Sequence, residues 1–152
     1  MRTVNCNDLI EIERLLGFTY PESFQSGVDE FVTFCGSPEF QRDFPTARLL
    51  LSKSEIIAER ESMDFRQSLG VAGVPLPPEI VERSDKVSRT LVPFLRDEGR
   101  QSPDTYAFDL QSGGPEYAVV VWSYADPMVV HEWVGFAAFI QWLREHVASH
   151  EK

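Results

Sequence analysis

The 152-residue chain has few basic residues for its number of acids. It contains 14 Lys and Arg against 24 Asp and Glu, which gives a formal net charge of −10. A nucleic-acid-binding surface needs clustered Lys and Arg to contact phosphates, so we expect no nucleic-acid partner. The imbalance is strongest after Arg100, where seven acids stand against only Arg144 and Lys152. An acidic surface suits a basic protein partner, because opposite charges steer association.

The sequence also lacks a targeting segment, a long apolar run and a cysteine framework. Its first ten residues, MRTVNCNDLI, contain no apolar core of a signal peptide. The longest apolar runs, such as YAVVVW, fall far short of the roughly 20 residues that span a bilayer. Cys6 and Cys35 could form one disulfide at most, and reduced thiols are the better expectation. These absences predict a cytoplasmic protein without a membrane contact.

Motifs of catalysis and metal binding are missing as well. The segment QSGGPE (111–116) lacks the Lys and Ser/Thr of a phosphate loop, and a hairpin turn explains its glycines. The sequence has no G-x-S-x-G elbow, no H-E-x-x-H and no C-x-x-C pair. His146 and His150 have a spacing that can bind a metal, but imidazolium near a helix C-terminus is also favourable by itself. We therefore expect no enzyme, no cofactor and no metal.

Helical patterns dominate the first half of the chain. A helix is expected over DLIEIERLLG (8–17), capped by Asn7, and its apolar face should hold Leu9, Ile12, Leu15 and Leu16. A second amphipathic helix should begin near Pro21 and end at Gly36. ARLLLS (47–52) is typical of a short buried strand. Ser52 and Glu55 then form a capping box for a helix over the segment up to residue 70.

The second half of the chain indicates an antiparallel meander closed by a helix. LVPFL (91–95) is expected to be a strand near a sheet edge, where Pro93 removes no ladder hydrogen bond. Further strands are expected over 105–110, 117–124 and 129–133, followed by a helix over 135–147. Helices first, then a meander, then a helix predict one α+β domain over residues 1–152. Its mainly antiparallel sheet should have the N-terminal and C-terminal helices packed on it.

Apolar alternation in the meander predicts its register and its two faces. Pairing Phe108 with Val119 and Tyr106 with Val121 creates a strong core face. That face holds Tyr106, Phe108, Leu110, Tyr117, Val119 and Val121. The opposite face holds Thr105, Ala107, Asp109, Ala118, Val120, Trp122 and Tyr124, and a turn through ADPM (125–128) adds Val129, His131 and Trp133.

This opposite face has three interpretations. A helix can cover it, because strands that are apolar on both faces are usually buried on both. It can be an exposed aromatic docking patch, since Trp and Tyr are favoured anchors and the acids Asp104, Asp109, Asp126 and Glu132 are near. A catalytic concavity is the third possibility, although Asp104 and Asp109 should lie on opposite faces of their strand. The candidate partner-binding residues are Trp122, Tyr124, Asp126, His131, Trp133, Asp104 and Asp109.

The order and spacing of these segments resemble the SUKH superfamily, over about residues 8–147. The resemblance is carried by LIEIERLLG followed by YPESF, by VDEFVTFCG, and by the strand-to-helix segment ARLLLSKSEIIAE. It continues through LVPFLRDEGRQSPDTYAFDL, PEYAVVVWSY and the closing FAAFIQWLREHV. The superfamily includes fungal cell-wall-assembly regulators and many bacterial immunity proteins, and it has no common catalytic residues.

The resemblance implies a cytoplasmic, non-catalytic immunity-type protein. Such a protein would bind and neutralise a cognate bacterial toxin domain, often a nuclease, whose basic surface would fit this acidic chain. A regulatory or scaffolding protein-interaction domain is the alternative that the fungal relatives suggest. A small-molecule-binding protein is a further alternative. The sequence specifies neither the partner nor the oligomeric state.

Overall fold

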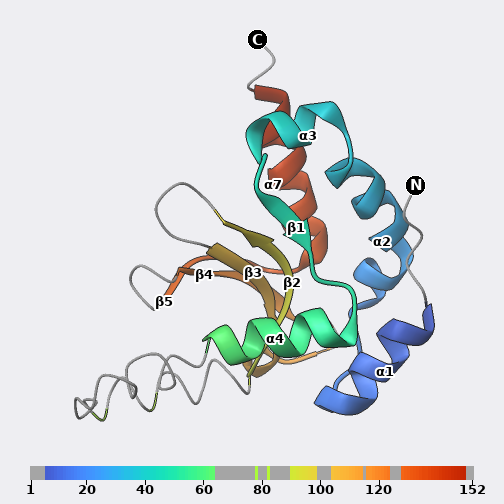
Figure 1. The fold of residues 1–152 in the computed structure, drawn as a ribbon, viewed down its shortest axis with the longest axis vertical. Coiled ribbons are helices and arrows are strands. Elements are labelled where there is room, and N and C mark those ends of the chain that lie inside the picture. The colour runs from blue at the N-terminus through green and yellow to red at the C-terminus, as the bar shows by residue number, and fades with distance from the viewer. Residues whose placement is uncertain are drawn as a thin grey trace.

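The fold, seen in a computed structural model, combines one antiparallel sheet with helices packed against it (Figure 1). The structure describes residues 6–63, 90–98, 104–114, 116–123 and 128–149, together with the single positions 78 and 82. Within these residues the sheet has five strands in the order β1-β2-β3-β4-β5. The expected α+β class with a mainly antiparallel sheet is therefore confirmed.

Helix α1 (Cys6–Leu16) begins close to the expected position and ends at Gly17, whose φ of 70° stops a helix. Leu9 and Ile12 are buried, as predicted. The prediction for Leu15 is wrong, because its side chain is 49% exposed. The helix packs against the core on one side only, and the buried stripe is too narrow to include this position.

Helix α2 (Glu22–Cys35) follows Pro21 and ends at Gly36, close to the predicted bounds. Its buried residues are Phe24, Val28, Phe31, Val32 and Cys35. A short helix that the sequence analysis did not predict, α3 (Pro38–Asp43), comes next. The Ser37 hydroxyl accepts a hydrogen bond from the Phe40 N–H at 3.2 Å, and this cap explains why a helix begins there.

Strand β1 (Ala47–Leu49) is shorter and less buried than predicted. The buried residues of this segment, Leu50 and Leu51, follow the strand. Helix α4 (Lys53–Met63) then begins at the predicted capping box. The Glu55 N–H donates to the Ser52 hydroxyl at 3.3 Å, and that hydroxyl donates to the Glu55 carboxylate at 2.8 Å. The rest of the expected helix, beyond residue 63, lies outside the described residues.

Four longer strands form the predicted meander: β2 (Leu91–Asp97), β3 (Asp104–Asp109), β4 (Ala118–Ser123) and β5 (Met128–Trp133). Phe108 pairs with Val119 and Tyr106 with Val121, so the predicted register is confirmed. A 3-10 turn, η1 (Leu110–Ser112), begins the connection between β3 and β4. The chain closes with α7 (Phe136–Ser149).

Pro93 lies where the sheet can accept a proline. Strand β1 pairs only with Leu95–Asp97, so the first half of β2 has β3 as its one strand neighbour among the described residues. A register shift between Pro93 and Leu95 also interrupts the ladder to β3. Because β1 is short, the part of β2 that contains Pro93 has one edge that no described strand covers, although β2 is an interior strand. This agrees with the expectation that Pro93 lies near a sheet edge.

The first face of the sheet, which carries Tyr106 and Phe108, is an aromatic core covered by α2 and α7. Phe24 of α2 packs edge-on against Phe108, with 5.3 Å between ring centroids, and Phe31 packs edge-on against Phe136 at 5.4 Å. Such pairs contribute about 0.5–1.5 kcal/mol each beyond their burial. Helices α2, α3 and α7 contact one another along this side (Figure 1).

The second face, which carries Ala107 and Trp122, is buried in a different way. Leu91, Ala107, Val120 and Trp122 form a small separate cluster. Beside it, Glu59 of α4 is 2% exposed and accepts hydrogen bonds from Thr105 at 2.5 Å and from Arg96 at 2.7 Å. The interpretation in which a helix covers this face therefore holds at Thr105. In the described part of the chain, no helix is long and apolar enough to cross a membrane.

Candidate protein-binding surface

A bulge in β5 decides which of the predicted site residues share a face. Trp122 pairs with Val129. The preceding residue of β4, Val121, pairs with His131, so β5 has one extra residue between these two pairs. Successive residues of a strand point to opposite faces, and a single extra residue reverses the alternation beyond it. His131 and Trp133 therefore lie on the first face, opposite to the prediction.

Ring contacts confirm this correction for Trp133. Its ring lies 5.0 Å from Phe139 of α7 and 6.2 Å from Tyr106, centroid to centroid, and both residues belong to the first-face core. Trp133 is 9% exposed, and Trp122 on the second face is 2% exposed. The interpretation of these two tryptophans as anchors on an open patch is therefore wrong. Each of the two indole rings packs into the buried cluster on its own face of the sheet.

The remaining predicted residues are spread over the sheet. Asp109 lies on the second face, where its carboxylate accepts a hydrogen bond from the Gln111 N–H at 3.0 Å and caps η1. Asp104 lies on the first face at the other end of the same strand, so the expectation that these two acids point apart is confirmed. Tyr124 and Asp126 lie outside the described residues.

Three predicted residues, Asp104, His131 and Trp133, do share one face. Asp104 pairs with Asp97 on one side and with Ser123 on the other, at the end of the sheet. Together with their neighbours they define what we term the acid–aromatic surface, which consists of Asp97, Asp104, Tyr106, Ser123, His131, Trp133 and Trp142. Sequence analysis missed Asp97 because it belongs to another strand, whose pairing brings it opposite Asp104.

Two carboxylates face each other across the strands of this surface. Asp97 and Asp104 are direct cross-strand partners, an arrangement that destabilises a sheet when both are charged. Burial and the negative charge of Asp97 raise the pKa of Asp104, while a hydrogen bond with Ser123 lowers it. Asp97 accepts a hydrogen bond from the Thr46 hydroxyl at 2.7 Å. Burial, with these two negative charges, also raises the pKa of Tyr106 above its usual range.

The aromatic part of the surface runs from β5 onto α7. The centroids of His131 and Trp133 are 4.3 Å apart, and those of Trp133 and Trp142 are 5.0 Å apart. The imidazole of His146 stacks on Trp142 at 5.1 Å. Trp133 is buried, whereas His131 on one side of it is exposed and Trp142 on the other side is half-buried. Trp142 was missed as a site residue, although its i, i+4 spacing to His146 places both on one helix face.

The described residues offer little for metal or thiol chemistry. They contain no group of three His, Cys, Asp or Glu side chains that could hold a metal ion. His150, the second member of the spaced histidine pair, lies outside them. Cys35 is a buried free cysteine, and burial raises the pKa of its thiol to about 12, which makes it a poor nucleophile at neutral pH.

Comparison with known proteins assigns no family to this chain. No protein-family model matches it, and neither does any curated protein or any solved structure. The resemblance to the SUKH superfamily therefore stays a prediction. The acid–aromatic surface has to be interpreted from its own residues.

Proposed function

We propose that this protein is an immunity-type protein that binds a cognate toxin domain and neutralises it without catalysis. The observation that carries the proposal is the acid–aromatic surface, where paired carboxylates share one face with the exposed imidazole of His131 and the half-buried indole of Trp142. Its two parts match the two requirements of a protein interface: charge that steers the partner, and aromatic area that anchors it.

The paired acids favour a basic partner. A chain of net charge −10 attracts a positively charged protein at long range, and Asp97 and Asp104 concentrate that charge at the end of the sheet. Because like charges at directly opposed positions lower the stability of the fold, a role in binding offers a reason for keeping them. A cation from the partner placed between the two carboxylates would relieve their repulsion.

The aromatic part supplies contact area next to that charge. Trp142 is half-buried and lies between the rings of Trp133 and His146, so its ring is already held in place before binding. A rigid aromatic side chain loses little conformational entropy when it is covered, and such residues are frequent interface anchors. In this proposal neutralisation takes place in the cytoplasm of the producing cell, where the toxin is made.

The proposal can be tested with the protein encoded by the neighbouring gene, the expected position of a cognate toxin. Co-expression with this chain should restore growth of cells that express the toxin. The double variant Asp97→Asn/Asp104→Asn should associate about tenfold more slowly, with a weaker dependence on salt. The double variant Glu11→Gln/Glu61→Gln removes the same charge from exposed helix positions and serves as the matched control.

The aromatic contribution should affect the dissociation rate constant. Trp142→Ala should raise the dissociation rate by about 30-fold, corresponding to roughly 2 kcal/mol, with little change in association. Trp142→Phe retains a ring and should give a smaller effect. Circular dichroism must first show that each variant is folded. Folded acid and aromatic variants that bind as the wild type does would exclude this surface, and a wild-type chain that gives no protection would exclude the immunity function.

A further inference from the structure

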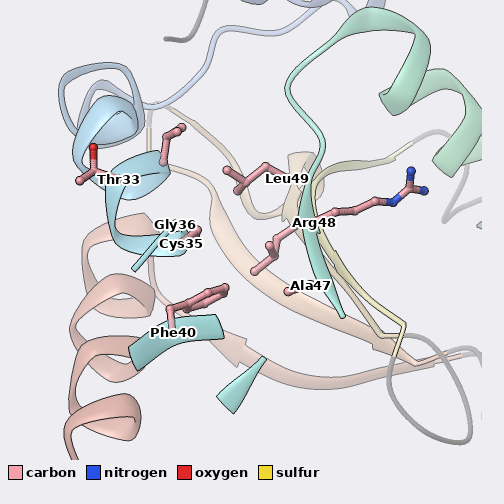
Figure 2. A pocket seen from close by; sticks show the side chains of 9 residues that line it. Thr33, Cys35, Gly36, Phe40, Ala47, Arg48 and Leu49 are labelled. Carbon is pink, nitrogen blue, oxygen red and sulfur yellow. The ribbon is translucent and has the colours of Figure 1, made fainter. Parts of the chain in front are cut away.

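The β1 edge of the sheet combines a cavity with a strand whose outer side pairs with no described strand. A cavity of about 520 Å³ lies between the C-terminal end of α2, helix α3 and strand β1. Figure 2 shows the side chains that line it. Its apolar lining comes from Val32, Cys35, Phe40, Ala47, Leu49 and Leu95. The volume lies within the range of about 300–1,000 Å³ that is usual for ligand pockets. The cavity is therefore large enough for one or two apolar side chains of a partner.

The backbone of β1 offers hydrogen-bonding groups beside this cavity. The Leu50 N–H donates to the Phe94 carbonyl at 2.9 Å, and the Glu98 N–H donates to the Thr46 carbonyl at 3.3 Å. In an antiparallel pair, bonded and non-bonded positions alternate, so Leu49 directs its N–H and C=O away from β2. Strand β1 ends the strand order, and no described strand pairs with that outer side.

The side chains of β1 divide between its two faces. Ala47 and Leu49 point toward the cavity, while the Arg48 side chain extends away from it (Figure 2). Arg48 is exposed, and its cross-strand neighbour is Arg96. Arg96 is bound by Glu59 and Glu98, whereas the Arg48 guanidinium projects into solvent as a positive group in an acidic protein. An added strand would meet an apolar pocket on one face and a positive charge on the other.

We propose that β1 accepts an extended segment of a partner protein as an added antiparallel strand. In this arrangement an apolar residue of the segment pairs with Leu49 and enters the cavity, and the next residue, an acidic one, lies beside Arg48. A further apolar residue lies beside Ala47, whose N–H already donates to the Phe44 carbonyl at 3.2 Å, so the main-chain pairing is centred on Leu49. This mode combines main-chain hydrogen bonds for affinity with alternate side chains for specificity. The inference goes beyond the proposed toxin binding and does not depend on it, since the acid–aromatic surface involves other residues.

The positive charge of Arg48 indicates which kind of strand can pair with β1. A second copy of β1 paired in register would bring two Arg48 side chains together, and like charges directly opposite are unfavourable. Charged residues on edge strands are also a common protection against uncontrolled pairing. An acidic residue at the same position converts that repulsion into attraction. The edge therefore fits a segment with an apolar–acidic–apolar pattern better than it fits another copy of this chain.

A peptide with that pattern tests the inference directly. The probe is acetyl-Thr-Phe-Glu-Val-Thr-amide, titrated into the full-length chain labelled with ¹⁵N. A Kd on the order of 0.1–1 mM is expected, because the edge is short. The amide signals of Leu49 and its neighbours should shift in a saturable manner. Two control peptides replace Glu by Lys or carry an N-methyl group on Phe, which removes its donor to Leu49, and each should bind at least fivefold more weakly.

Reversing the charge of Arg48 tests whether the peptide binds at β1 and not at another surface. Arg48→Glu should reverse the preference, so that the peptide with Lys binds more tightly than the peptide with Glu. Arg14→Glu makes the same change at an exposed position of α1 and should leave the preference as in the wild type. Ala47→Phe should block the cavity and abolish binding, provided that the variant keeps the wild-type spectrum.

Several outcomes would overturn the inference. They are the absence of saturable shifts up to 5 mM peptide, which is well above the expected Kd, shifts confined to residues remote from β1, and a preference for Glu that survives in Arg48→Glu. Concentration-dependent dimerisation in ultracentrifugation that Ala47→Phe abolishes would assign the edge to a second copy instead. Loss of toxin binding with intact peptide binding would refute only the proposed function, and the reverse result would refute only this inference.

Discussion

The two faces of the sheet are both buried, but different interactions bury them. On the first face, phenylalanines from the sheet, α2 and α7 pack edge to face in one large cluster. On the second face a cluster of four residues adjoins a buried carboxylate, that of Glu59, which accepts hydrogen bonds from Thr105 and Arg96. Apolar packing is non-directional and tolerates small shifts, whereas a buried charge needs each of its partners in place. The second face should therefore be the more sensitive to geometry.

The largest effect is expected from a cavity on the first face. Phe108 is fully buried and packs against Tyr20, Phe24 and Phe94. Phe108→Ala should lower the free energy of unfolding by about 3–5 kcal/mol, as measured by urea denaturation. Phe108→Leu retains most of the volume and should lose less than half of that amount. A loss below 1 kcal/mol for Phe108→Ala would contradict the central place of this residue in the core.

The second-largest loss of stability is expected when the buried charge on the second face is removed. Glu59→Gln weakens the hydrogen bonds from Arg96 and Thr105, and we expect a loss of about 1.5–3 kcal/mol. Glu61→Gln, an exposed change on the same helix, should stay within about 0.5 kcal/mol of the wild type. A double-mutant cycle with Thr105→Val should show coupling between the two positions. Additive effects would mean that the observed contact contributes no stability.

A smaller effect is expected at the start of the helix that carries Glu59. Ser52→Ala removes the cap of α4 and should cost about 1 kcal/mol. The same variant should increase hydrogen exchange in the first turn of α4 more than in β3, because the cap acts locally. Ser54→Ala is the matched control, because it removes a hydroxyl 3.4 Å from that of Ser52 and leaves the bond to the Glu55 N–H in place. Equal effects of the two substitutions would argue against the capping box.

The smallest expected change in stability is a gain, and it concerns Asp104. Because burial and Asp97 raise the pKa of Asp104, the folded protein binds this proton more tightly than the unfolded chain does. Asp104 therefore adds stability at acid pH, and this contribution is lost as the pH rises through the raised pKa. Asp104→Asn should be slightly more stable than the wild type at pH 7, by thermal denaturation, and the difference should shrink toward pH 4. Asp109→Asn, at the other end of β3, keeps an acceptor for the Gln111 N–H and should show no such gain at pH 7.

Local patterns in the sequence predicted most of the fold. The apolar alternation of β3 and β4 specified their register, because a slip by one residue would turn Phe108 and Tyr106 to the wrong face. The Ser52–Glu55 capping box predicted the start of α4 for a similarly local reason. The short helix α3 was missed, since six residues carry too little periodicity to be recognised.

The sequence by itself determined the acidic charge, the two apolar faces of the meander and the order of helices and strands, because these depend on composition and on periods of two or 3.6 residues. Only the tertiary structure decided where His131 and Trp133 point, because one extra residue in β5 reverses the alternation without altering the apolar pattern. It also brought Asp97 beside Asp104 and opened a cavity beside β1. These features depend on pairing between segments that are separate in the chain, and no local period records such pairing.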